Sequence, residues 1–192
     1  MRTAIKLAAL PIAAAALVGF TGTGGARSLR SAQTATCLGM DATITTGTPG
    51  TGAQAGFTVF TGTPGNDVIV GTAGNDHIRG EGGDDRICGL GGDDRLFGGD
   101  GTDRIHGGDG NDQIEGQNGN DVIEGGNGND RVEGNAGDDN VNGSMGDDLV
   151  SGDAGNDLVD GGLGTDQCFD PENGSFTRCE STSTTKPAAL FP

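Results

Sequence analysis

The chain has 192 residues, a length that predicts one domain with short tails. It contains 40 glycines, no Trp and no Tyr, so few large side chains are available for a conventional core. The formal charge of −17, from 28 acidic against 11 basic residues, argues against nucleic acid and anionic membranes as partners and favours cations.

Residues 1–26 predict a secretory signal peptide. A short basic start is followed by an apolar run from Leu7 to Phe20 and by small residues up to Ala26. The run is too short for a spanning helix, which needs ~20 residues, and no other segment predicts membrane insertion. A lipid anchor at Cys37 is the weaker alternative, because the preceding Thr34-Ala35-Thr36 lacks the expected leucine. The prediction is therefore an extracellular protein, in an oxidising compartment.

Residues 27–61 predict a linker and degenerate capping strands. Thr43-Ile44-Thr45 and residues 57–61 read as short strands. Gly56 and Phe60 fit the fourth and eighth positions of the repeat that follows, and Thr58 stands where that repeat has Asp. We expect this segment to cover the first coil of that repeat, because the end of a solenoid exposes backbone and core, and to bind no cation, because it lacks the Asp.

Residues 62–169 fall into twelve nine-residue repeats without insertion. Gly fills every first position and also every fourth: Gly65, Gly74, Gly83, Gly92, Gly101, Gly110, Gly119, Gly128, Gly137, Gly146, Gly155 and Gly164. Asp fills every sixth position: Asp67, Asp76, Asp85, Asp94, Asp103, Asp112, Asp121, Asp130, Asp139, Asp148, Asp157 and Asp166. The eighth position of the last repeat is Cys168. In the other eleven repeats it is aliphatic: Ile69, Ile78, Ile87, Leu96, Ile105, Ile114, Ile123, Val132, Val141, Val150 and Val159.

This pattern predicts a β-solenoid. The glycines suit a six-residue turn, and positions seven to nine form a three-residue strand with only the eighth side chain inward. Two repeats complete one coil, so residues 18 apart stack, with Asp67 over Asp85. Stacked carboxylates about 5 Å apart repel by roughly 3 kcal/mol at an effective dielectric near 20, and a hard cation would reverse that cost.

The repeat resembles the RTX, or haemolysin-type, calcium-binding nonapeptide family, whose pattern is G-G-x-G-x-D-x-U-x with U a large apolar residue. The resemblance implies an all-β, right-handed parallel β-roll. It also implies Ca²⁺ between successive turns on the same side, held by the sixth-position aspartates and by carbonyls of the glycine turns. Twelve turns paired one coil apart leave ten such sites at most. One departure is the second position, which is Gly only at Gly99, Gly108, Gly126 and Gly162, so uniform affinity is not expected.

The small core predicts that calcium drives folding. One aliphatic side chain per repeat is too little to offset the conformational entropy of ordering 108 residues. We therefore expect the calcium-free chain to be largely disordered and to fold on binding.

Four cysteines allow three pairings. Cys168 is inward in the last repeat and Cys179 follows in a short loop, whereas Cys88 is outward and free to meet Cys37. These positions favour Cys37–Cys88 and Cys168–Cys179, an arrangement similar to small secreted RTX-like proteins of actinobacteria. Residues 170–180 then predict a C-terminal cap, and 181–192 a flexible tail.

No catalytic machinery is predicted. His77 and His106 occupy outward strand positions on opposite sheets and lack partners for a zinc or nucleophile site. The aspartates are accounted for by the repeat, so a two-carboxylate hydrolase is not favoured. The expected protein is a non-catalytic calcium-binding module.

Two binding alternatives remain open. Outward Arg86 and Arg104 on one sheet, with Arg95 and Arg131 on the other, could grip carboxylates of a surface glycan or a protein partner. The competing interpretation is that they balance the nearby acids Glu115, Glu124 and Glu133. Ice binding is the remote alternative. It needs a regular Thr or Asn ladder, and the fifth positions are mixed.

Overall fold

The fold is known from a computed structural model, which describes residues 36–37, 39–41, 43–44, 48–49, 56–170 and 174–183. The expected signal peptide at 1–26 and the last residues of the expected tail, 184–192, lie outside this part of the chain. Contacts divide the chain into units 1–33 and 34–192, and only the second contains described residues. Every regular element in the described part is a β-strand, and no helix there could cross a membrane.

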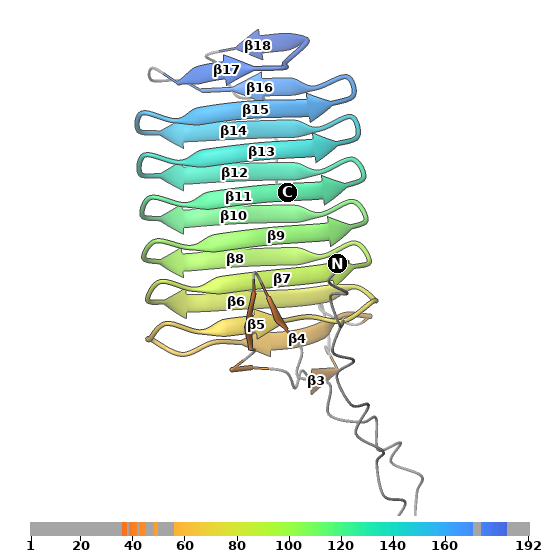
Figure 1. The fold of residues 1–192 in the computed structure, drawn as a ribbon, viewed down its shortest axis with the longest axis vertical. Helices are drawn as coiled ribbons and strands as arrows, with labels where there is room; N and C mark the ends of the chain where they lie inside the picture. The colour runs from red at the N-terminus through yellow and green to blue at the C-terminus, as the bar shows by residue number, and fades with distance from the viewer. Residues whose placement is uncertain are drawn as a thin grey trace, which may run out of the picture. The chain divides into compact units, whose positions relative to one another are not determined.

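Two parallel sheets form the body of the second unit, and Figure 1 shows their strands stacked as successive rungs. The nine-stranded sheet contains β3 (Thr48–Pro49), β4 (Thr58–Thr61), β6 (Asp76–Gly82), β8 (Arg95–Asp100), β10 (Gln113–Asn118), β12 (Arg131–Ala136), β14 (Leu149–Ala154), β16 (Gln167–Phe169) and β18 (Ser181–Ser183). The seven-stranded sheet contains β5 (Val68–Val70), β7 (Arg86–Gly91), β9 (Arg104–Asp109), β11 (Val122–Asn127), β13 (Asn140–Met145), β15 (Leu158–Leu163) and β17 (Ser175–Thr177). A separate antiparallel pair joins β1 (Thr36–Cys37) to β2 (Met40–Asp41).

Consecutive strands alternate between the two sheets, so the chain is a parallel β-solenoid of about six turns. Within each sheet the neighbours are 18 residues apart, as in the partners Ile114 and Val132. The predicted all-β roll with two nine-residue units per coil is therefore confirmed.

The strands are longer than the sequence predicts. Most run over six residues, from the seventh position of one repeat to the third of the next, and the turn is left with three residues. In β10, Ile114 and Gly116 are both buried while their neighbours are partly or fully exposed. The alternation thus continues through the first-position glycine. The prediction of a three-residue strand and a six-residue turn was wrong, because an inward glycine lets the strand continue where a larger side chain would fill the narrow interior.

The eighth positions form the core. A single column of buried side chains runs from Phe60 through Ile69 and its equivalents to Cys168, each 0–2 % exposed. Phe60 extends the column by one repeat at the N-terminal end, as its place in a degenerate repeat predicts. Ile44, Phe176 and Cys179 pack against the column while staying partly exposed.

The N-terminal segment adds edges to both sheets. β4 pairs in parallel with β6, and β3 then pairs antiparallel with β4. Ile44 forms a single parallel bridge to Ile69 and donates its N–H to the Val68 carbonyl. Thr45 lies outside the described residues, so the predicted strand at 43–45 is seen only as this bridge.

Two cysteines close the C-terminal end. Cys168 and Cys179 form a disulfide with 5.9 Å between their Cα atoms, which confirms that predicted pair. Cys88 is also disulfide-bonded and is buried with Val68 and Val70 on the outward side of β5 and β7, where β1 lies. The Cys37 side chain lies outside the described residues, so its pairing with Cys88 stays a prediction that the position of β1 supports.

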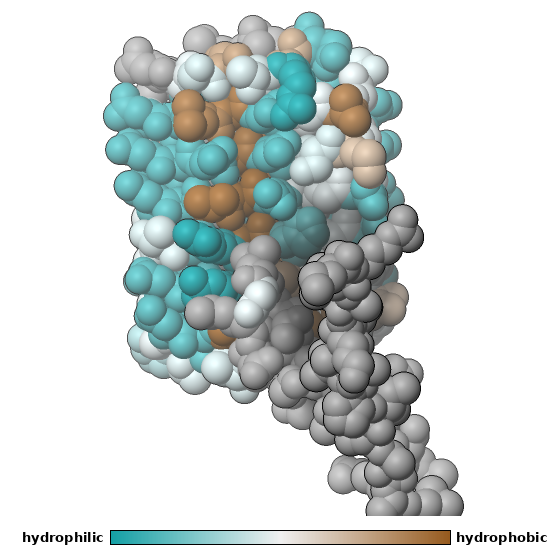
Figure 2. All heavy atoms as spheres, viewed as in Figure 1, coloured by the Kyte–Doolittle hydropathy of each residue, from teal (hydrophilic) through white to brown (hydrophobic). Residues whose placement is uncertain are grey.

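The outer faces are mostly polar. Figure 2 shows one broad face that is largely hydrophilic, with apolar side chains scattered over it. Five large apolar residues are exposed in the described part, all on strands of the seven-stranded sheet: Leu90, Val122, Met145, Leu158 and Leu163.

Candidate metal centre

The sixth-position aspartates lie where each turn enters a strand, in two rows along the two edges of the solenoid. All twelve are buried, between 0 and 7 % exposed. Stretches of acidic sequence normally stay in solvent, because burying a carboxylate costs free energy unless the charge is compensated. Two rows of buried acids therefore require a compensating group.

One carboxylate oxygen of each aspartate ties neighbouring coils together. The Asp103 N–H donates to Asp121 Oδ1 at 2.8 Å, and the Asp121 N–H donates to Asp139 Oδ1 at the same distance. The same bond joins every other pair of sixth-position aspartates 18 residues apart, at 2.8–2.9 Å. Each row is thus a continuous hydrogen-bonded ladder, and the predicted stacking of Asp67 over Asp85 is confirmed.

The second carboxylate oxygen has no partner. Ten of these Oδ2 atoms are buried and accept no hydrogen bond: those of Asp85, Asp94, Asp103, Asp112, Asp121, Asp130, Asp139, Asp148, Asp157 and Asp166. A buried oxygen without a partner is costly, and a repeated one marks a group that the protein chain alone does not supply.

The first-position glycines leave room beside these oxygens. A Cβ on Gly98 would meet the Asp103 Oδ2 atom and would lie 2.6 Å from the Gly116 carbonyl oxygen of the next coil. The same two kinds of oxygen crowd the other first-position glycines from Gly71 to Gly143. Oxygens from two successive coils therefore face one gap that only glycine keeps open.

The fourth-position glycines hold the turns in a left-handed conformation. From Gly83 to Gly164 they all have positive φ, as in Gly101 at +131°. The Gly101 N–H donates to the Asn118 carbonyl at 2.8 Å, and a Cβ on Gly101 would collide with the Gly83 carbonyl oxygen. These carbonyls thus lie between successive turns. Their role as metal ligands, which the family resemblance implies, stays a prediction.

Burial raises the pKa of the aspartates. It brings the pKa of Asp94 and Asp130 to about 8 and that of Asp121 to about 7. The carboxylates one coil away on the same row raise these three pKa values further, while the backbone N–H bond to Oδ1 lowers them. Five others reach about 6 for the same leading reason: Asp85, Asp103, Asp112, Asp139 and Asp148. The rows are a strained anionic array that a cation or protons would relieve.

The donor set fits a hard divalent cation. Carboxylate and carbonyl oxygens are the ligands that Ca²⁺ takes, six to eight at a time. No group of three His, Cys, Asp or Glu side chains gathers in the described residues, so carbonyl oxygens and water must complete any coordination sphere. Within the rows, Ca²⁺ would be held by Asp Oδ2 atoms and turn carbonyls, where it would neutralise the paired carboxylates.

The first coil differs from the rest. The Thr63 N–H and hydroxyl both donate to Asp67 Oδ2, at 2.6 and 2.8 Å. Thr72 binds Asp76 in the same way, through its N–H to Oδ2 at 2.5 Å and its hydroxyl to Oδ1 at 3.1 Å. Asp67 and Asp76 are the two sixth-position aspartates whose Oδ2 atoms have partners, and those partners are the second-position threonines of their own repeats. This use of Thr at the second position went unnoticed in the sequence.

The other second positions carry backbone strain. Beyond the first coil they all adopt positive φ, including six that are not glycine: Glu81, Leu90, Gln117, Asn135, Ser144 and Asp153, at 71–83°. Left-handed backbone costs an ordinary residue roughly 1–2 kcal/mol. The departure from the G-G pattern therefore introduces strain at the turn, and the unequal affinity that the sequence predicts stays a prediction.

The histidines are separated as predicted. His77 lies on β6 and His106 on β9, in different sheets. His77 is nonetheless buried, because its ring packs on Phe97 at 5.3 Å and its Nε2 accepts a bond from Arg79 Nε at 3.2 Å. His106 faces Glu124 at 3.5 Å. Neither arrangement is a nucleophile with its base or a zinc site.

The fifth-position side chains also form ladders. Asp84 N–H donates to Asn66 Oδ1 at 3.0 Å, and similar bonds continue on both edges. Their oxygens are engaged by backbone, which accounts for the mixture of Asn and Asp and gives no support to ice binding.

Comparison with known proteins agrees with this geometry. The sequence model of the RTX calcium-binding nonapeptide repeat matches the chain in four copies, over residues 61–96, 97–132, 115–150 and 133–168. Together the copies span residues 61–168, more than half of the 192 residues. No curated protein matches the chain.

Proposed function

The chain belongs to the RTX calcium-binding nonapeptide repeat family and is a calcium-binding repeat protein; from this membership we propose that it is secreted, folds on binding Ca²⁺ and catalyses no reaction. The observation that carries the proposal is the set of ten buried Oδ2 atoms without partners. Each of these oxygens faces the coil that follows its own. Eight of them, from Asp85 to Asp148, lie in gaps between repeat turns, and those of Asp157 and Asp166 belong to the last two repeats, which the C-terminal segment follows.

Folding on binding follows from the electrostatics. Without metal, like charges on neighbouring coils and the loss of hydration oppose burial of the carboxylates, which is why their pKa values are raised. The hydrophobic core that could offset this electrostatic cost is only a single column of mostly aliphatic side chains. Binding a cation only in the coiled state would shift the equilibrium toward that state by mass action.

Secretion is supported by the disulfide chemistry. Cys168–Cys179 is closed, and no cysteine in the described part is free. Disulfides persist in oxidising compartments, which agrees with the signal peptide that the N-terminal sequence predicts. Extracellular calcium would then meet the chain after export.

The proposal is tested by titrating the mature protein with Ca²⁺ and monitoring its far-UV circular dichroism. A titration with Mg²⁺ is the control. We expect a cooperative coil-to-β transition with Ca²⁺ and none at equal Mg²⁺, since Mg²⁺ prefers a compact octahedron of oxygens and keeps its water. A β-rich spectrum in excess chelator would show that the core and the disulfides suffice, and would overturn folding on binding.

Adhesion to an anionic surface is the second candidate function. Arg86 and Arg104 are direct partners on β7 and β9, and neither takes part in the ion pairs His106–Glu124 or Arg178–Asp160. Two arginines at paired positions of adjacent strands suit the carboxylates of an acidic glycan. A glycan array in calcium buffer, with Arg86→Gln/Arg104→Gln as the comparison, separates this role from a solitary calcium module.

A further inference from the structure

The segment after the last repeat pairs with the two sheets as one more pair of repeats would. β17 pairs with β15 so that Val159 partners Phe176, and β18 pairs with β16 so that Gln167 partners Ser181. This register places Arg178 opposite Gly161, where the next first-position glycine would stand. It places Glu180 opposite Asp166, where the next aspartate would stand.

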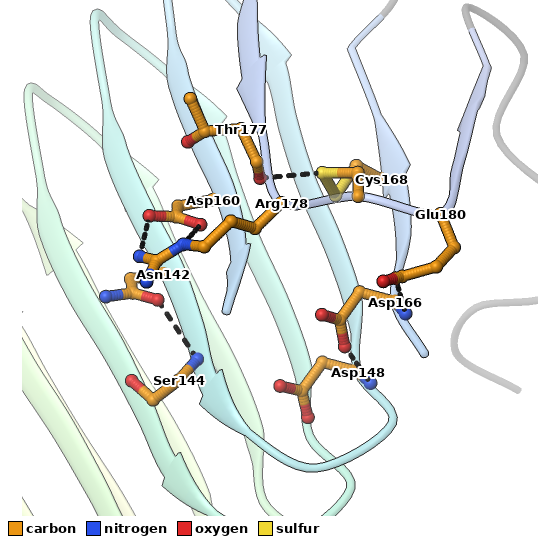
Figure 3. Close-up of a disulfide and its surroundings, with 10 residues drawn as sticks. Asn142, Ser144, Asp148, Asp160, Asp166, Cys168, Thr177, Arg178 and Glu180 are labelled. Carbon is orange, nitrogen blue, oxygen red and sulfur yellow. Dashed lines mark hydrogen bonds and ion pairs between the residues drawn. A yellow bond between two sulfur atoms is a disulfide. The ribbon is translucent and has the colours of Figure 1, made fainter. Parts of the chain in front are cut away.

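Glu180 continues the aspartate ladder. The Asp166 N–H donates to Glu180 Oε2 at 2.5 Å, just as the Asp148 N–H donates to Asp166 Oδ1 at 2.9 Å. Figure 3 shows these two bonds in succession on one edge of the solenoid. A glutamate has one more methylene than an aspartate, which suits a segment that reaches the position by a shorter path.

The Arg178 carbonyl takes the place that the carbonyl of a first-position glycine has in the gaps between repeats. A Cβ on Gly161 would meet the Arg178 carbonyl oxygen and would lie 2.7 Å from Asp166 Oδ2. One coil earlier, the same place beside Gly143 is bounded by Asp148 Oδ2 and the Gly161 carbonyl. The oxygen pair that faces each gap between repeats is therefore rebuilt by residues outside the repeat.

The gap also holds an uncompensated charge. Asp166 is 0 % exposed, and its Oδ2 accepts no hydrogen bond. The Arg178 guanidinium does not supply the compensation through a hydrogen bond, because Nε donates to Asp160 Oδ1 at 2.7 Å and the second nitrogen binds Asp160 Oδ2. Figure 3 shows the arginine directed toward Asp160.

We propose an additional calcium site between the last repeat turn and the C-terminal segment, formed by the Asp166 carboxylate, the Arg178 carbonyl and the Glu180 carboxylate. It rests on the proposed function and adds one site to the ten between repeats. Cys179 is the single residue that links Arg178 to Glu180, where a repeat has four residues between the equivalent positions. The Cys168–Cys179 disulfide holds this shortened turn on the core.

Glu180→Gln in the full mature chain tests the site, with Glu124→Gln as the matched control on an outer face. Gln keeps an oxygen that accepts the Asp166 N–H and loses only the negative charge. Bound Ca²⁺ per chain is counted by equilibrium dialysis at saturating free Ca²⁺. We expect Glu180→Gln to bind one Ca²⁺ fewer than the wild type, and Glu124→Gln to bind the same number. An unchanged count in Glu180→Gln would mean that Glu180 only caps the ladder, and would overturn this inference.

Amide hydrogen exchange gives a second measurement. In the wild type, the amides of residues 175–183 should gain protection when Ca²⁺ saturates the chain. In Glu180→Gln this gain should be lost there while the repeats keep theirs. Equal protection in both proteins would also overturn the site. A wild type that binds no Ca²⁺ in dialysis would instead refute the proposed function itself, so the two failures are distinguishable.

Discussion

The Asp103 N–H donates to Asp121 Oδ1 at 2.8 Å, and this bond leaves Asp121 Oδ2 buried with no partner. The one side chain thereby does two things. Its Oδ1 atom binds the preceding coil, and its Oδ2 atom faces the gap toward the following coil, where a Cβ on Gly116 would also lie 2.7 Å from the Gly134 carbonyl oxygen. Fold and metal binding depend on the same atoms, so changes at these positions act on both.

Replacing Asp121 with asparagine should have opposite effects with and without calcium. The asparagine side chain could still accept the Asp103 N–H but would bring no charge, and Asp121 faces two gaps. We expect up to two fewer bound Ca²⁺ per chain and a several-fold higher Ca²⁺ midpoint for folding. Without metal, folding of the variant should be less unfavourable than folding of the wild type. The substitution removes a buried carboxylate whose pKa is raised by burial to about 7. Ca²⁺ titrations followed by circular dichroism measure the midpoint, and Glu124→Gln is the control.

Acid should partly replace calcium. Asp94 and Asp130 have folded-state pKa values of about 8 against 3.8 for an unperturbed Asp, chiefly because they are buried. Folding of the metal-free chain therefore takes up protons. Its stability is greatest below the unfolded pKa and falls as the pH rises through the folded pKa. Demetallated protein should gain β structure in circular dichroism between about pH 8 and about pH 5, and its Ca²⁺ midpoint should rise over the same interval, since protons compete. A metal-free chain that loses β structure on such acidification would contradict the raised pKa values.

The first-position glycines should tolerate no side chain. A Cβ on Gly98 would lie 2.6 Å from the Gly116 carbonyl and against Asp103 Oδ2. Gly98→Ala should lower the free energy of unfolding in saturating Ca²⁺ by roughly 1–3 kcal/mol, as overpacking does, and should weaken calcium binding. Gly91→Ala is the matched control, because a Cβ there meets nothing closer than 3.6 Å. Urea unfolding of both variants gives the comparison, and equal losses would refute a special role for the first position.

Leu90→Gly should stabilise the solenoid. Leu90 has φ of +81° and is exposed, so its side chain contributes little packing to offset the strain. Glycine removes about 1–2 kcal/mol of left-handed strain and adds about 0.5–1 kcal/mol of unfolded-state entropy. The net gain should be about 0.5–1 kcal/mol in urea unfolding with Ca²⁺ present. Asn135→Gly, at φ of +74°, should gain less because Asn adopts this region more readily. A loss of stability in Leu90→Gly would show that Leu90 makes a contact worth more than its strain.

The repeat made most of the fold predictable. Gly, Asp and one aliphatic residue at set positions in each nine-residue unit determine the coil length, the inward column and the stacking of the aspartates. Each unit contacts mainly its neighbours, so a local pattern defines the whole arrangement. The strand length was missed because the inward first-position glycine looks like a turn residue in sequence, although its lack of a side chain is what allows the strand to continue.

The ends were less predictable, because they lack that periodicity. Glu180 lies 14 residues after Asp166 rather than 18, so no repeat search would align them, and only the pairing of β16 with β18 brings them together. Likewise, Phe97 and His77 lie 20 residues apart and meet on the outer face of the nine-stranded sheet. Contacts that join a repeat to a non-repeat segment depend on where the chain returns in space.

The sequence by itself determined the family, the 18-residue coil and the aspartates that line its edges, since these follow from spacing alone. Only the tertiary structure decided how each carboxylate is divided between a backbone bond and an unpartnered oxygen, which second positions are strained, and which residues complete the last turn. Those features depend on the distance between atoms of successive coils, and a spacing in sequence specifies neighbours without specifying which of their atoms meet.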